Sequence, residues 1–182
     1  MKEVFYLQYI FLVITLFLSS CDRSDDEGEN GAASLPPITE TGAGTFGCLI
    51  NGNVFVHTDG GLNCYYQFVD GGYYFGIQGR NEDEAPISII LSTEQKSLSE
   101  NETLTLLSHQ AGHATGGAFF KISPTDGTHT FTNEQYEGEL TIIHFDIQNR
   151  IVSGTFWFDI KHPVTGERVE IREGRFDAHF MQ

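Results

Sequence analysis

Short apolar runs separated by polar turns fill the chain from residue 45 onward. In the segments 168–172 and 174–180, apolar side chains recur at every second position, a period that buries one face of a strand and leaves the other wet. The dipeptides Asn51-Gly52 and Asp70-Gly71 stand between apolar runs, as they do in β-hairpins. No stripe of helical period reaches the length of about 11 residues that would indicate a helix.

These patterns predict an all-β domain of about nine or ten strands, either a β-sandwich or a calycin-like β-barrel. The region between residues 94 and 102 could accommodate one helical turn. The apolar segments that carry the prediction are 46–50, 54–57, 64–69, 73–78, 87–91, 103–107, 118–122, 138–146, 151–159, 168–172 and 174–180.

Residues 1–20 have the features of a bacterial lipoprotein signal peptide. Lys2 gives a positive start to the chain, and residues 4–18 form an apolar run. Its length of about 15 residues suits a signal peptide and is short of the ~20 that a membrane-spanning helix needs. The run ends in Leu-Ser-Ser-Cys at 18–21, which resembles a lipobox and predicts Cys21 as the lipidated first residue of the mature protein. An ordinary signal peptide and a single membrane anchor are the alternatives.

The residues after Cys21 predict a tether. The acidic cluster at 22–27 resembles the export signal of surface lipoproteins in Bacteroidota. We therefore expect an outer-membrane lipoprotein exposed on the cell surface, with a periplasm-facing position as the alternative. Residues 21–44 hold little to bury, which predicts a flexible linker. The folded domain is expected at 45–182, a length that suits one core.

Charge narrows the choice of partners. The chain has a formal net charge of −15, and residues 45–182 hold 18 Asp and Glu against 8 Lys and Arg. Phosphate recognition needs a basic face, so nucleic acid is not expected as a partner. The expected membrane contact is the acyl anchor alone. A protein, a glycan or a small hydrophobic ligand remain open as partners of the domain.

Cys48 and Cys64 are a candidate disulfide. Export places them in an oxidising compartment, and a bridge would contribute roughly 3 kcal/mol in the chain-entropy model. Two buried free thiols are the alternative, because spacing along the chain does not reveal geometry. Without a histidine cluster the pair is a poor zinc site.

The sequence predicts no catalytic, metal or cofactor site. His109 and His113 have the i, i+4 spacing of metal-binding helices, but Gly112 lies between them and favours a loop. The carboxylates at 82–84 are adjacent, without the alternating spacing of a calcium loop. We therefore expect a protein that is not an enzyme. A hydrolase would instead require carboxylates that converge only in the fold.

Aromatic residues are the enriched class, with 15 Phe, 7 Tyr and 1 Trp. Most of those in the domain are expected in the core. The pairs Tyr65-Tyr66 and Tyr73-Tyr74 supply the candidate ligand-facing rings, because neighbours along a strand point to opposite faces and one tyrosine of each pair should face outward. Such rings would stack on a sugar or a hydrophobic ligand. Cross-strand pairing on a wet sheet face is the alternative.

Several segments resemble a family of uncharacterised Bacteroidota lipoproteins, a domain of unknown function with a compact antiparallel β fold. They are 44–46, 51–52, 138–142, 152–156, 165–167 and 174–177. The resemblance implies the fold and the lipoprotein address, and it supplies no catalytic residues. With the address, it predicts a membrane-anchored lipoprotein whose β domain is a non-enzymatic binding or interaction module. A lipid or glycan carrier with a calycin-like cavity is the alternative, and an extracellular hydrolase is less favoured.

Overall fold

The computed structural model describes residues 34–182, so the predicted signal peptide, Cys21 and residues 21–33 of the predicted linker lie outside the described residues. The described chain contains eleven strands and no helix, which confirms the all-β prediction. The strands are β1 (Thr45–Ile50), β2 (Asn53–Val56), β3 (Asn63–Val69), β4 (Gly72–Arg80), β5 (Ser88–Thr93), β6 (Thr103–Leu106), β7 (Ala114–Ser123), β8 (Asp126–Phe131), β9 (Gly138–Asp146), β10 (Ile151–Lys161) and β11 (Arg168–His179).

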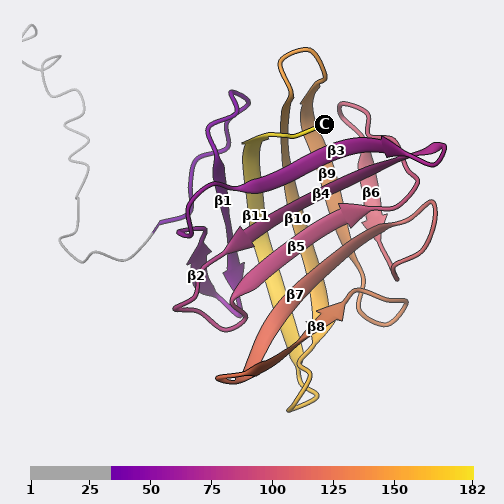
Figure 1. Ribbon diagram of the computed structural model, residues 1–182. Helices are drawn as coiled ribbons and strands as arrows, with labels where there is room; N and C mark the ends of the chain where they lie inside the picture. The colour runs from indigo at the N-terminus through magenta and orange to yellow at the C-terminus, as the bar shows by residue number, and fades with distance from the viewer. Residues whose placement is uncertain (1–33) are drawn as a thin grey trace, which may run out of the picture. The chain divides into compact units, whose positions relative to one another are not determined.

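All of these strands belong to one sheet, in the order β2-β1-β11-β10-β9-β6-β7-β5-β4-β3, with β8 added beside β7. Neighbours are antiparallel except β6 and β7, which meet in parallel at Leu106 and Ala114. The sheet folds over so that β3, β4, β5 and β7 cross in front of β9, β10 and β11 (Figure 1). The β3 edge meets the end of the chain at an isolated bridge between Tyr65 and Met181. The fold is therefore an open, sandwich-like sheet and not a closed barrel.

Phenylalanine rings fill the space between the two layers. Phe75 of β4 lies against Phe176 of β11, with ring centroids 6.2 Å apart. A Cβ atom on Gly79 of β4 would lie only 2.2 Å from the ring of Phe46 in β1, so glycine is required for the layers to approach this closely. The interior is consequently a packed core of buried apolar side chains.

The strand pattern differs from the sequence prediction in several places. Asp126-Gly127 looks like a turn, yet it opens strand β8, which pairs with β7 at the edge of the sheet. The segments 168–172 and 174–180 form one long strand, β11, which ends at His179. Gly174 within it faces the ring of Phe156, to which a Cβ atom would be 2.4 Å away. The segment 94–102 contains no helical turn.

The end of the predicted linker belongs to the folded domain, which corrects the boundary at residue 45. Residues 34–182 lie in one compact unit. The buried carboxylate of Asp177 accepts hydrogen bonds from Thr39 Oγ1 at 2.7 Å and from the Gly42 backbone N–H at 2.8 Å. Burial acts to raise the pKa of Asp177, but the hydrogen bonds from Thr39 and its neighbours outweigh it and lower the pKa. The polar composition of residues 21–44 predicted a flexible tether, whereas the Asp177 carboxylate of β11 holds residues 39–43 by hydrogen bonds.

Cys48 and Cys64 are free thiols in the structure, which corrects the favoured disulfide. Cys48 lies in β1 opposite Phe55, and Cys64 lies in β3 opposite Ile77. Burial in the core raises the pKa of both thiols, that of Cys64 to about 12, so both are protonated and unreactive at neutral pH. The sequence placed them in separate strands, but their spacing along the chain could not show which residues each thiol faces across the sheet.

Candidate functional site

The inner face of the β3–β4 hairpin runs out of the core toward the turn that joins the two strands. On β3, Tyr66 is buried, whereas Phe68 is 63% exposed. On β4, Phe75 is fully buried, whereas Tyr73 is 40% exposed. In Figure 1 the turn of this hairpin reaches beyond the strands of the opposite layer. The last two inner-face rings therefore lie outside the packed interior.

The turn itself sets which rings face each other. Asp70 and Gly71 form a two-residue connection with positive φ angles of 47° and 86°, as a tight hairpin turn of the primed type requires. The resulting register places Phe68 opposite Tyr73. The Asp-Gly signal in the sequence thus aligns the two exposed rings across the hairpin.

Three aromatic rings form a continuous surface on this face. Tyr66 and Tyr73 are stacked, with centroids 4.9 Å apart and planes only 5° from parallel. Phe68 lies 5.0 Å from Tyr73 with its plane tilted by 60°. Phe145 meets Tyr66 edge to face at 5.0 Å. The buried ring of Tyr66 therefore connects the exposed pair to the core.

These rings line a groove of about 380 Å³, which lies in the size range of small-molecule sites. Ile147, 52% exposed in the turn between β9 and β10, lines it as well. Gln67, Val69 and Gln182 complete the lining. No acidic, basic or histidine side chain is among the lining residues. The groove is consequently aromatic and aliphatic, with amide groups as its main polar side chains.

The hydroxyl of Tyr66 points back to the backbone of a buried residue. It accepts a hydrogen bond from the backbone N–H of Leu98 at 3.4 Å. Burial raises the pKa of Tyr66, and the contact with Leu98 offsets only part of that effect. The hydroxyl is therefore protonated at neutral pH and serves to position the ring.

The structure brings together only two of the four tyrosines singled out from the sequence. Tyr66 and Tyr73 share the groove, whereas Tyr65 and Tyr74 lie on the opposite face of the hairpin. Tyr65 covers Gly76, where a Cβ atom would lie 2.4 Å from its ring. The sequence predicted that the outward-facing ring of each pair would meet a ligand. The groove instead uses the inward-facing rings, at the point where the core no longer covers them.

Phe68 and Ile147 belong to the groove but were missed from the sequence. Phe68 had a usable signal, because it follows Tyr66 by two residues and therefore shares its face of the strand. Ile147 had none, since it lies some 80 residues from the hairpin and reaches the groove through the fold.

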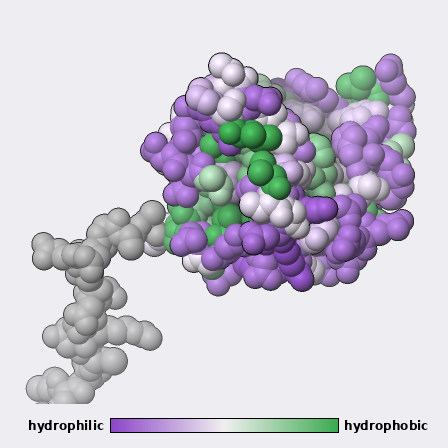
Figure 2. Space-filling view, turned by 90° about the horizontal axis from the view of Figure 1, so that it is seen from below, coloured by the Kyte–Doolittle hydropathy of each residue, from purple (hydrophilic) through white to green (hydrophobic). Residues whose placement is uncertain are grey.

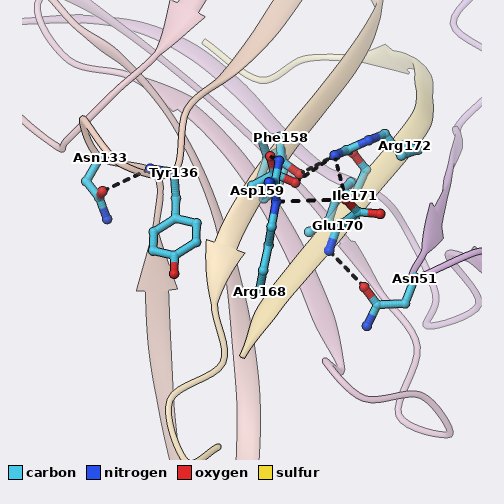
Figure 3. Close-up of polar contacts among 9 residues, drawn as sticks. All are labelled: Asn51, Asn133, Tyr136, Phe158, Asp159, Arg168, Glu170, Ile171 and Arg172. Atoms are coloured by element: carbon cyan, nitrogen blue, oxygen red, sulfur yellow. Dashed lines mark hydrogen bonds and ion pairs between the residues drawn. The ribbon is translucent and has the colours of Figure 1, made fainter. Parts of the chain in front are cut away.

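A second polar cluster surrounds Asp159 near the end of β10 (Figure 3). The Asp159 side chain is 5% exposed, and one carboxylate oxygen lies 2.8 Å from Arg172 Nη2. Arg168 binds the other oxygen, and Glu170 lies 3.3 Å from Arg172. Arg172 also lies over the ring of Trp157, 5.5 Å from its centroid. The charges of this cluster are paired with one another, as in a structural ion network.

The end of the molecule seen in Figure 2 has a small group of hydrophobic residues among hydrophilic ones. Ile122, near the end of β7, and Val164, in the turn between β10 and β11, are exposed. They line a pocket of about 240 Å³ together with charged residues, among them Glu84 and Lys121. This mixed surface contrasts with the uncharged lining of the groove at the hairpin.

His109 and His113 lie in the loop between β6 and β7 and do not share a ligand site. His109 Nε2 is 3.2 Å from Glu94, and His113 Nε2 is 2.8 Å from the amide of Gln110. Within residues 34–182, His, Cys, Asp and Glu side chains nowhere gather in threes as a metal site would require. The same residues hold no helix with the length and hydrophobicity needed to cross a bilayer.

Comparisons with family models, with curated proteins and with solved structures give no match for this chain. The resemblance to Bacteroidota lipoproteins therefore stays a prediction.

Proposed function

We propose that the chain is a non-enzymatic binding module, held at the cell envelope by a lipid on Cys21, with the groove on the β3–β4 hairpin as its binding site. The observation that carries the proposal is the exposure of Phe68 and Tyr73, two adjoining rings outside the core. Single exposed apolar residues are ordinary, but contiguous ones mark binding sites. The interior is filled by side chains, so the ligand binds outside the core.

The chemistry of the lining supports binding over catalysis. Tyrosine hydroxyls and amides are the polar side-chain groups of its lining residues, and none of these residues has a carboxylate, imidazole or thiol side chain. General acid–base and nucleophilic mechanisms draw mainly on such groups. The carboxylate of Asp159 is occupied by two arginines. Retention of a ligand is therefore the function that this arrangement serves best.

The address in the proposal is supported by the N-terminal sequence. A Cys21→Ala variant tests it, because acylation needs the thiol. We expect the variant to lose incorporation of labelled fatty acid and to leave the membrane fraction. Protease treatment of intact cells then distinguishes surface exposure from a periplasm-facing position. Retention of the acylated variant in the membrane would contradict the lipoprotein assignment.

Phe68→Ala tests the binding site. Binding of oligosaccharides, fatty acids and peptides would be measured for the wild-type chain and for the variant. The matched control is Phe131→Ala, because Phe131 is 41% exposed but lies on β8, outside the groove lining. We expect saturable binding of at least one class that Phe68→Ala weakens and Phe131→Ala does not. Equal binding by both variants would refute the groove as the site.

A further inference from the structure

We propose that the free edge of β8 pairs with the β8 edge of a second copy of this chain. In the proposed register the two strands are antiparallel, and Thr130 lies opposite the partner's Thr130. This surface is separate from the groove, because no β8 residue lines the groove on the β3–β4 hairpin. The partner is therefore additional to any ligand that the groove binds.

Backbone groups on one side of β8 lack partners. Thr132 N–H donates to Gly116 C=O at 2.8 Å, so the alternation of an antiparallel pair directs Thr130 toward β7 as well. The N–H and C=O groups of His129 and Phe131 then point away from β7, and no group within residues 34–182 hydrogen-bonds to them. In Figure 1, β8 forms the lower border of the front layer. This edge can accept a further strand.

The other two edge strands are partly covered by the chain itself. On β2, Val56 C=O accepts a hydrogen bond from Asn81 Nδ2 at 3.1 Å. On β3, Tyr66 N–H donates to Met181 C=O at 2.8 Å. By contrast, β8 contains no Lys, Arg or Pro, and its one charged residue is Asp126 at the first position. Lysine and proline commonly protect edge strands from pairing, so β8 is the edge best suited to a partner strand.

Two copies of β8 match each other in one register. With Phe131 opposite the partner's His129, the copies exchange four hydrogen bonds that use every free group of both edges. A twofold axis then relates the two strands, as an interface between identical patches requires. The neighbouring register would pair Phe131 with the partner's Gly127. That register is less favourable, because Gly127 N–H already donates to Asp126 Oδ1 at 2.9 Å.

The side chains on the outer face suit the same register. Within one copy, the rings of His129 and Phe131 are stacked, with centroids 5.9 Å apart. Residues directly opposite each other in antiparallel strands have their side chains on one face, where aromatic pairs stabilise the sheet. Each imidazole would therefore meet a phenyl ring of the partner as well as the one in its own strand.

A buried hydroxyl at the centre of this register favours a second copy over an unrelated strand. Thr130 Oγ1 is buried and has no hydrogen-bond partner in the part of the chain that the structure describes, which costs free energy. In the proposed register the partner's Thr130 lies directly opposite, on the same face of the sheet. Threonines that face each other across antiparallel strands form hydrogen bonds. A second copy supplies this partner at the required position.

Disulfide cross-linking of the full chain in detergent tests the register, with Thr130→Cys and Thr128→Cys as the variants. Opposite residues of a non-hydrogen-bonded antiparallel pair have Cα atoms about 4.5 Å apart, a distance that a disulfide spans. The two copies of residue 128 would be about 14 Å apart. Thr128 is the matched control, because it precedes Thr130 by two residues in the same strand. The wild-type chain controls for Cys21, Cys48 and Cys64.

We expect mild oxidation to convert Thr130→Cys to a covalent dimer, with a yield about tenfold or more above that of Thr128→Cys or of wild type. A non-reducing gel measures the yield. Equal yields from the two variants would overturn the proposed register.

His129→Pro tests the edge itself. The N–H of His129 points away from β7, so proline removes a donor to the partner strand and none to β7. His129→Ala is the control, because it keeps the N–H. Edge pairing buries little area, so the dimer should be weak. By sedimentation velocity at roughly 100 μM, we expect wild type and His129→Ala to dimerise and His129→Pro to lose the dimer.

Two outcomes would overturn the proposal. The first is a wild-type chain that is monomeric at this concentration and a Thr130→Cys variant that gives no cross-link, which would leave the β8 edge to a strand of another protein. The second is a dimer that persists in His129→Pro and is lost in Phe68→Ala, which would place the interface at the groove. Neither result depends on whether the groove binds a ligand.

Discussion

The groove on the β3–β4 hairpin and the ion cluster around Asp159 lie in the same sheet but differ in whether their side chains have partners. Around Asp159 the charges are paired, and Arg168 and Arg172 bind both oxygens of the buried carboxylate. In the groove, Phe68 and Tyr73 are large rings exposed to water. The first region satisfies its own side chains, whereas the second leaves apolar surface that a partner would cover.

The two regions separate residues that stabilise this fold from residues available for binding. Side chains of the ion cluster should matter to the free energy of unfolding and not to ligand binding. Exposed rings of the groove should behave in the reverse way. Tyr66 belongs to both categories, because it is buried in the core and stacked on Tyr73. Substitutions in the two regions test this division directly.

Tyr66→Ala should have the largest effect. Removing a buried ring that contacts Phe145 and Phe180 leaves a cavity, and we expect the free energy of unfolding to fall by about 3–5 kcal/mol. Urea denaturation followed by tryptophan fluorescence measures it. Tyr66→Phe is the control and should cost less than about 1 kcal/mol, because only the long hydrogen bond to Leu98 is lost. A Tyr66→Ala protein as stable as wild type would place this ring outside the core.

Arg172→Ala should come next. The variant takes one of two cations from the buried carboxylate of Asp159 and a donor from the carbonyl of Phe158. Breaking a buried ion pair on one side costs about 3 kcal/mol, which the same denaturation experiment would detect. Glu170→Ala serves as the control, with an expected change within about 0.5 kcal/mol, since Glu170 is 51% exposed. Similar losses in the two variants would argue against a special role for the buried pair.

Asp177 can be compared with Asp159, because it is also a buried carboxylate but accepts hydrogen bonds from neutral donors instead of arginines. Its folded pKa is lowered below the unfolded value of about 3.9. Its contribution is therefore complete above that value and is lost as pH falls through the folded pKa. Asp177→Asn should cost roughly 2 kcal/mol at pH 7 and flatten the decline in stability below about pH 4. If stability declines at low pH in the variant as it does in the wild type, other carboxyl groups determine that decline.

Phe68→Ala should have the smallest effect on stability. The ring is 63% exposed, so we expect the free energy of unfolding to change by no more than about 0.5 kcal/mol, although ligand binding is weakened. Thermal melting of Phe68→Ala beside wild type is the measurement. A loss above about 2 kcal/mol would mean that Phe68 stabilises the fold and would remove the division between the two regions.

Much of the hairpin could be predicted from the sequence. Asp70-Gly71 between apolar runs predicts the turn, and the alternation in 64–69 and 73–78 predicts which residues share a face. The uncovered end of that face could not be predicted, because it depends on where the opposite layer stops. Ile147 reaches the groove from the distant β9–β10 turn, and no local pattern indicates this.

The other differences also come from contacts distant in sequence. Residues 39–43 look like linker because they offer no large apolar side chain for a core, yet Asp177 binds them from β11. Strand β8 carries few apolar residues because it lies at an edge beside β7. Propensity and periodicity describe a segment alone, whereas these assignments depend on what lies beside it.

The labelling rates of the two buried thiols can report local opening at two places in the domain. Cys48 and Cys64 lie in different strands, β1 and β3, and the carbonyl of Cys64 accepts a hydrogen bond from Met181 at the junction beneath the groove. A buried, protonated thiol reacts with an alkylating reagent only after its surroundings open. The labelling rate of Cys64 therefore reports how often the groove edge separates from the end of the chain, while that of Cys48 reports the opening of β1. A ligand that occupies the groove should slow the labelling of Cys64 more than that of Cys48.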